Sequence, residues 1–281
     1  LDALEKQLRA LGFSEDEIKE QVEKARKKNE HKPLPKGIEQ LKALAEKGDA
    51  KAQGKLAREL HYGEGNDVEA FEWAKKAAAQ NDPQGQFVVG RSYHFGIGVD
   101  KDRKGAVDWY RKAADQGLAL AQNNLGGIYQ RGDGVDKDLQ EAFELYSKAA
   151  EQNLPLAINN LGAMYFNGLG VERNYPKAFE LYSKAAELGN VLAMDHLGSM
   201  YESGRAAGGR DFKKAYQWYT KAASQGDAIA QRKLGVMYRL GTRVAKDNKK
   251  AFEWFSKAAL QGDAVAQQAL GDFYVGGVEV P

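Results

Sequence analysis

The chain has 281 residues, 43% of them hydrophobic, with 41 lysines and arginines against 39 aspartates and glutamates. The resulting net charge of +2 is too small to favour nucleic acid or an anionic membrane surface as a partner. The absence of cysteine excludes disulfides, cysteine-ligated metals and thiol nucleophiles, and no apolar run approaches the roughly 20 residues that a membrane span requires.

Residues 1–36 are predicted to form a helical hairpin that caps the rest of the fold. Leu4 and Leu8 share one face of a first helix, and Ser14 with Glu17 has the pattern of a capping box that starts a second one. Terminal units of a repeat array need such a cap with a polar outer face. A separate binding module is the alternative, because the Leu-Gly-Phe-Ser turn faintly resembles that of ubiquitin-associated domains.

The rest of the chain is predicted to be a repeat array. Residues 37–49 have the pattern of the second half of a repeat, and residues 50–281 hold six full repeats and then a single first helix, Ala264–Val275. We expect the missing last helix to reflect either a truncation or a lone helix that serves as a cap. A fixed period of this length indicates stacked helical units that bury their apolar faces against each other. The register is set by the glycine of a Leu-Gly pair, at Gly90, Gly126, Gly162, Gly198, Gly235 and Gly271.

The stretch Pro155–Asn190 shows the repeat most clearly. Leu161 and Tyr165 lie four residues apart and so share one face of a first helix. Gly168 follows in a column that is glycine in every repeat, which a position needing positive φ or a helix C-cap would explain. Asn174 stands in a column of asparagine and aspartate, the residues that cap the start of a second helix. Each repeat is therefore predicted to be an antiparallel helix pair.

Several columns of this stretch recur along the chain, namely Ala157, Leu161, Gly162, Tyr165, Gly168, Gly170, Val171, Lys177, Ala178, Tyr182, Lys184, Ala185, Ala186 and Gly189. Together they resemble the Sel1-like repeat family, a relative of tetratricopeptide repeats. The resemblance covers residues 50–281 and implies an all-α fold, a right-handed α-solenoid superhelix of helix-turn-helix repeats. It also implies a role in contacts between proteins, without a catalytic residue common to the family.

No catalytic constellation emerges from the sequence. It lacks a G-x-S-x-G elbow, a P-loop, a dinucleotide-binding glycine fingerprint and an H-E-x-x-H pair. His61 and His94 occupy one column of adjacent repeats, which favours the lining of a groove over metal binding, since a metal site needs further ligands. No catalytic residue, metal or cofactor is therefore expected. The alternative function is a weak hydrolase that acts on cell-wall material.

The partner-binding residues are predicted on the first helix of each repeat. By analogy with tetratricopeptide arrays, first helices line a concave groove, and five columns face the partner: six and three before the Leu-Gly glycine, then one, four and five after it. Arginine and aromatic side chains, the usual anchors of protein interfaces, gather in the first three repeats, so the partner is predicted to be an acidic protein or peptide. The predicted groove residues are Arg58, His61, Tyr62, Phe87, Arg91, His94, Phe95, Asn123, Gln130, Arg131, Asn159, Phe166, Asn167, Asp195, Glu202, Arg232 and Arg239.

These patterns predict a non-enzymatic adaptor or scaffold of bacterial type that holds one protein partner. The resemblance implies a setting in signalling, envelope assembly, host interaction or the neutralisation of a toxin by an immunity protein. The absence of cysteine favours the cytoplasm. The periplasm stays open because the chain begins at Leu1 and not at methionine, so we expect the native N-terminus to have been cut off or omitted. The partner's identity and the oligomeric state are left open.

Overall fold

The computed structural model describes residues 14–20, 36–63, 66–242 and 244–275, which form α-helices joined by short loops and contain no β-strand. The first helices of the repeats are α4 (Ala50–Tyr62), α6 (Pro83–Phe95), α8 (Ala119–Arg131), α10 (Pro155–Asn167), α12 (Val191–Ser203), α14 (Ala228–Leu240) and α16 (Ala264–Val275). The second helices are α5 (Asp67–Ala79), α7 (Arg103–Asp115), α9 (Leu139–Glu151), α11 (Tyr175–Glu187), α13 (Phe212–Ser224) and α15 (Asn248–Leu260), and α3 (Lys36–Glu46) precedes them all.

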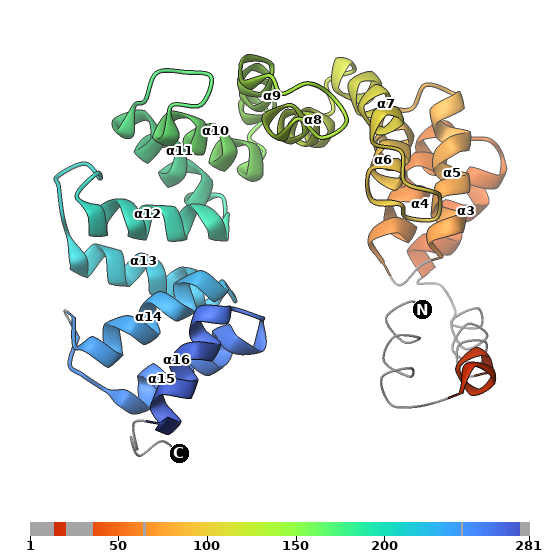
Figure 1. Ribbon diagram of the computed structural model, residues 1–281. Coiled ribbons are helices and arrows are strands. Elements are labelled where there is room, and N and C mark those ends of the chain that lie inside the picture. The colour runs from red at the N-terminus through yellow and green to blue at the C-terminus, as the bar shows by residue number, and fades with distance from the viewer. Residues whose placement is uncertain (1–13, 21–35, 64–65, 243, 276–281) are drawn as a thin grey trace.

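The helices form an open arc in which each one packs against the next along the chain (Figure 1). Apolar residues are buried between neighbouring helices all along this arc, as expected of stacked units. The predicted all-α solenoid is therefore confirmed. Within the described ranges, no helix is both long and apolar enough to cross a membrane.

Short polar residues start the second helices, and left-handed glycines end the first helices, where the columns predict. The Asn174 side chain accepts a hydrogen bond from the Lys177 N–H at 2.9 Å, and Gly168 closes α10 with φ of 70°. Gly63 is the exception, because it ends α4 with an extended φ of −93°, and an added Cβ there would lie 2.8 Å from the Glu59 carbonyl oxygen. Of the two predicted roles, Gly63 has that of a helix C-cap and not that of a residue with positive φ. The first repeat lacks the segment that follows this glycine in later repeats, so the chain leaves α4 by a different path.

The two helices of a repeat approach closely because a glycine on one faces an aromatic ring on the other. A Cβ added at Gly162 would lie 2.9 Å from Cε1 of Tyr182, and one added at Gly198 would lie 2.4 Å from Cε1 of Tyr219. Both tyrosines are buried. The Leu-Gly glycine is therefore a packing position, as its small size suggests.

Only part of the predicted N-terminal cap falls among the described residues. The capping box is present there, since the Ser14 N–H donates to Glu17 Oε2 at 2.8 Å. Helix α3 contacts the first repeat in the same way as a later second helix contacts the repeat that follows it. Gln53 Nε2 donates to the Ala45 carbonyl, just as Gln122 Nε2 donates to the Ala114 carbonyl. Most of the predicted hairpin lies outside the described residues. The domain boundaries at 36 and 49 therefore stay predictions.

Acid is expected to weaken the starts of α13 and α15. Backbone hydrogen bonds, led by those from the Lys214 and Lys250 N–H groups, hold the pKa of Asp211 and Asp247 below the usual aspartate value. A lowered folded-state pKa stabilises the fold above the usual pKa, and this stabilisation is lost as pH falls through the lowered value. The double variant Asp211→Asn/Asp247→Asn keeps both caps but cannot titrate. Its melting temperature should fall less than that of the wild type between neutral pH and about pH 3, measured by circular dichroism. Parallel losses in the two proteins would contradict this account.

Candidate partner-binding groove

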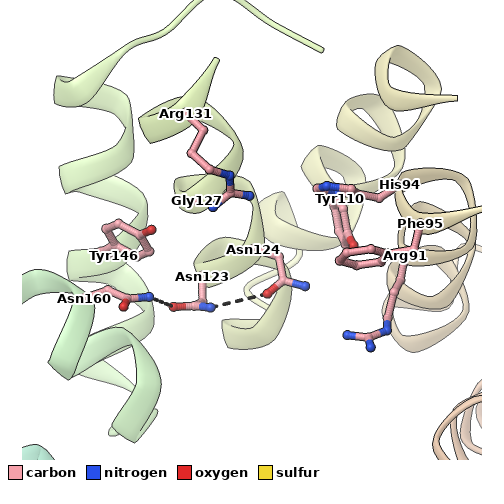
Figure 2. Close-up of a pocket in the computed structure, with 10 residues that line it drawn as sticks. All are labelled: Arg91, His94, Phe95, Tyr110, Asn123, Asn124, Gly127, Arg131, Tyr146 and Asn160. Atoms are coloured by element: carbon pink, nitrogen blue, oxygen red, sulfur yellow. Dashed lines mark hydrogen bonds between the residues drawn. The ribbon is translucent and has the colours of Figure 1, made fainter. Parts of the chain in front are cut away.

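A pocket of about 180 Å³ lies between the first helices of the second, third and fourth repeats (Figure 2). It is bordered by α6 on one side, α8 in the middle and α10 on the other, with one tyrosine from each of α7 and α9. Five of the predicted groove residues line it. The full lining is Arg91, His94, Phe95, Tyr110, Asn123, Asn124, Gly127, Arg131, Tyr146 and Asn160.

Arg91 is held at the edge of this pocket by three predicted groove residues. Its Nε donates to Nε2 of His61 at 2.7 Å, and its guanidinium lies 4.7 Å from the ring centroid of Tyr62 and 5.2 Å from that of Phe95. Burial, followed by the charge of Arg91, lowers the pKa of His61, so the neutral ring acts as the acceptor. Such an arginine stacked on aromatic rings has its long side chain already ordered for binding.

His94 lies deeper, 8% exposed, with its ring stacked on Phe95 at 4.5 Å. Its Nε2 is 2.9 Å from Oδ2 of Asp133, and the other oxygen of Asp133 is 2.9 Å from Nε of Arg103. Burial lowers the pKa of His94, although Asp133 acts in the opposite direction. His94 therefore forms a wall of the pocket and is already hydrogen-bonded.

Polar residues three before the Leu-Gly glycine are bonded to the next repeat instead of facing open solvent. Asn160 Nδ2 donates to Oδ1 of Asn123 at 3.0 Å, and one repeat further His196 Nδ1 lies 3.0 Å from Oδ1 of Asn159. Asn123 and Asn159 are only 4% and 3% exposed. This column therefore links repeats. Asn123 retains one edge on the pocket, but the structure brings Asn159 to no pocket described here.

Phe87 is a correction to the predicted groove. It is 1% exposed, its ring centroid lies 5.8 Å from that of Tyr110, and it belongs to the same buried cluster as the residues of α4. Because α4 packs directly against α6, this position is covered. Phe87 therefore stabilises the junction and cannot contact a partner.

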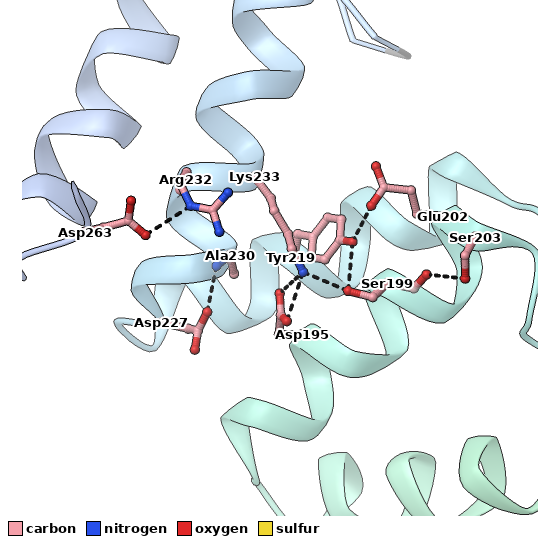
Figure 3. A network of polar contacts seen from close by, with 10 residues as sticks. All are labelled: Asp195, Ser199, Glu202, Ser203, Tyr219, Asp227, Ala230, Arg232, Lys233 and Asp263. Carbon is pink, nitrogen blue, oxygen red and sulfur yellow. Dashed lines mark hydrogen bonds and ion pairs between the residues drawn. The ribbon is translucent and has the colours of Figure 1, made fainter. Parts of the chain in front are cut away.

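The charged groove residues of the last repeats are paired within the chain (Figure 3). Lys233 Nζ lies 2.7 Å from Oδ1 of Asp195, and Arg232 Nε lies 3.0 Å from Oδ2 of Asp263. Arg239 contacts Asp272 at 3.4 Å, and Glu202 accepts a hydrogen bond from the Tyr219 hydroxyl at 2.7 Å. These side chains are therefore engaged before any partner arrives.

The remaining predicted residues are divided between contacts and open surface. Arg58 pairs with its neighbour Glu59 at 3.0 Å, and Gln130 Oε1 accepts from the Tyr146 hydroxyl at 2.9 Å. Asn167 donates to the carbonyl of its own helix, and the Phe166 ring lies between Tyr175 and Tyr182 under the guanidinium of Arg205. In contrast, neither Arg91 nor Arg131 forms an ion pair with any carboxylate in the described part of the chain.

Ser199, Lys233 and Tyr219 bring together the elements of a serine nucleophile with a lysine base. Lys233 Nζ is 2.7 Å from Ser199 Oγ, and the Tyr219 hydroxyl is 3.3 Å from the same oxygen (Figure 3). However, Lys233 Nζ also contacts both oxygens of Asp195, at 2.7 and 2.9 Å. The Asp195 carboxylate thus holds Lys233 in an ion pair. The cluster is therefore an ion-paired link between repeats.

The fold and its groove define an α-solenoid suited to contacts between proteins. The family model of the Sel1 repeat matches residues 50–82, 83–118, 119–154, 155–190, 191–227 and 228–263. The chain therefore belongs to the Sel1 repeat family, whose repeats generally mediate protein–protein interactions and whose members are typically non-enzymatic scaffolds. No curated protein matches the sequence.

Solved structures with the same fold are similar to the chain over most of its length. A Sel1 repeat protein from Oxalobacter formigenes is 38% identical with a TM-score of 0.73, over 82% of this chain and 91% of that one. A protective antigen of uropathogenic Escherichia coli strains is 39% identical with a TM-score of 0.71, over 88% of this chain, which spans only 53% of the antigen. An immunity protein from Pseudomonas aeruginosa is 28% identical with a TM-score of 0.50, over 66% of this chain and 67% of that one.

Proposed function

We propose that the protein is a non-enzymatic adaptor that holds an acidic segment of one protein partner in the groove formed by α4, α6 and α8. Arg91 and Arg131 carry this proposal, because both border one pocket and neither has a carboxylate partner among the described residues. The predicted groove arginines of the sixth repeat, Arg232 and Arg239, have intramolecular aspartates instead. A cation without an internal counter-ion at the edge of a concave site favours an anionic partner.

Aromatic side chains next to the arginines support the same reading. Tyr62 and Phe95 are each 53% exposed and lie against the guanidinium of Arg91. Arginine and tyrosine are enriched among the residues that dominate binding energy at protein interfaces. An acidic segment that carries an apolar residue would therefore find both a charge and an apolar surface on this part of the groove.

Several biological settings suit an adaptor of this kind. Signalling, envelope assembly, host interaction and toxin neutralisation are all served by a protein that masks or holds another. The similarity to an immunity protein, at 28% identity, supports the neutralisation of a toxin as the first setting to examine. An acidic loop of such a toxin would be the segment held by the groove.

Hydrogen exchange on a captured complex tests where the partner binds. The full chain is immobilised, a bound protein is recovered from the source cells, and amide exchange is compared in the free and bound states. We expect exchange to slow in residues 50–62, 83–95 and 119–131, which form the first helices of the first three repeats. Slowing confined to the second helices, or to α12 and α14, would contradict the proposal.

A further inference from the structure

The Tyr110 hydroxyl is a buried donor without an acceptor. The residue is 0% exposed and borders the pocket, and its hydroxyl oxygen has no hydrogen bond of normal geometry among the described residues, although the Asn124 side chain lies close enough to act against the rise in its pKa. Burial is the main cause that raises the pKa of Tyr110, so the hydroxyl keeps its proton. A buried hydroxyl without a partner is costly, and native proteins rarely keep one without a reason.

The equivalent tyrosines of other repeats show what Tyr110 lacks. The Tyr146 hydroxyl donates to Gln130 at 2.9 Å, and the Tyr219 hydroxyl donates to Glu202 at 2.7 Å. Both acceptors stand four residues after the Leu-Gly glycine. In the second repeat that column holds His94, whose Nε2 is already engaged by Asp133. The second repeat thus has the donor but no acceptor in the usual column, and the fourth repeat also lacks one, because Phe166 stands there beside Tyr182.

Other donors meet Tyr110 at the same pocket. Asn124 Oδ1 accepts from Asn123 Nδ2 at 3.3 Å, which leaves its own amide nitrogen to point towards the side of Tyr110 and Arg91 (Figure 2). Arg131 lies over Gly127, where an added Cβ would come within 3.1 Å of Nη1. Glycine in a helix interior is destabilising, and here it makes room for the guanidinium.

We propose that this pocket seats one carboxylate group of the partner, with the Tyr110 hydroxyl as a neutral donor and Arg91 and Arg131 as the charged ones. The inference rests on the proposed function and names the group that the groove recognises. A carboxylate is acceptor-only, with about four lone-pair sites that suit a pocket rich in donors. The volume of about 180 Å³ suits one side chain or one chain end. Both a glutamate side chain and a free C-terminus supply this chemistry.

Three short peptides test the carboxylate and its source. Acetyl-Gly-Glu-Gly-amide offers a side-chain acid, acetyl-Gly-Gly offers a chain end, and acetyl-Gly-Gln-Gly-amide offers neither. Each is titrated into the full chain while the Nε–H signals of Arg91 and Arg131 are followed by NMR. We expect shifts of both signals with one or both acidic peptides and none with the glutamine peptide. Equal effects of all three peptides, or no effect of any, would overturn the inference.

The variant Tyr110→Phe separates recognition from a structural role. It removes only the hydroxyl, so affinity for the acidic peptide that binds should fall about three- to tenfold, the effect of one hydrogen bond. The melting temperature should stay the same or rise, because a buried unpaired hydroxyl is lost. Tyr182→Phe, the same change in the fourth repeat and away from this pocket, should leave affinity unchanged. Unchanged affinity in Tyr110→Phe would overturn the inference.

The two proposals fail in different ways. If acidic peptides do not bind while substitution of Arg91 and Arg131 still abolishes capture of the partner, only the carboxylate pocket is wrong. If the substitutions leave partner capture intact, the proposed function fails, whatever the peptides do.

Discussion

The double variant Arg91→Glu/Arg131→Glu is expected to bind the captured partner about 100-fold more weakly than the wild type, or not at all. Each charged hydrogen bond to an acidic partner contributes about 1.5–3 kcal/mol, and about 1.4 kcal/mol is a factor of ten in affinity. Loss of two such bonds therefore predicts at least this factor, and repulsion adds to it. Isothermal titration calorimetry or biolayer interferometry measures the change.

A matched control separates a local effect from one of net charge. Arg173→Glu/Lys184→Glu changes the charge by the same amount at two residues that do not line the pocket. Its affinity should stay within about threefold of the wild type at physiological salt, where exposed charges are largely screened. Equal losses in both variants would show that only net charge matters. The far-ultraviolet circular dichroism of both proteins should match the wild type.

Replacing a Leu-Gly glycine with alanine is expected to lower the free energy of unfolding at Gly198 and to raise it at Gly271. Gly198→Ala places a Cβ 2.4 Å from the Tyr219 ring, which is 1% exposed and anchored to Glu202. Overpacking of this kind costs about 1–3 kcal/mol, more than the gain of about 1 kcal/mol in helix propensity. At Gly271 nothing lies within 4 Å of an added Cβ. There the same substitution should stabilise the protein by about 0.5 kcal/mol.

Urea unfolding of the two single variants measures these free energies. The predicted order of midpoints is Gly271→Ala highest, wild type in the middle and Gly198→Ala lowest. If both substitutions moved the midpoint in the same direction, the glycine would recur in the repeats for a reason other than contact with the tyrosine ring. Because a long repeat array can unfold in steps, midpoints are compared with the same probe.

The helical repeats could be predicted from the sequence because their signals are local. Each cap, turn and helix face depends on residues within one repeat. Gly168, for example, ends α10 and Asn174 begins α11 where predicted. Among the described glycines of this column, Gly63 alone lacks a positive φ, and it falls in the repeat with a deletion. Periodicity therefore predicts local geometry well wherever the period is intact.

The candidate site could be predicted only in part, because periodicity identifies a helix face but not what bonds across it. Arg91 and Arg232 both fall in predicted groove columns, yet only Arg232 finds an aspartate, 31 residues further along the chain. That pairing depends on how one repeat is placed on the next. Tyr110 was missed for a related reason, since its column is buried everywhere and the missing acceptor becomes visible only when the repeats are compared in three dimensions.

A signal for the links between repeats was nevertheless present in the columns. Asn123, Asn159 and Asp195 stand three before the Leu-Gly glycine, and Asn160, His196 and Lys233 stand two before the next one. A polar residue in one column is thus matched by a complementary residue in the other, one repeat later. Reading these columns in pairs would have moved Asn159 and Asp195 from the groove to the junctions.

A charge-swap cycle with the captured partner tests the central claim most directly. Acidic residues are replaced by lysine in the segment of the partner whose own amide exchange slows in the complex, and this partner is titrated against the wild type and against Arg91→Glu/Arg131→Glu. If Arg91 and Arg131 contact those acids, the doubly reversed pair should regain at least about tenfold in affinity over either single reversal. Losses that simply add in the doubly reversed pair would show that the arginines and the acids do not meet, and would contradict the account.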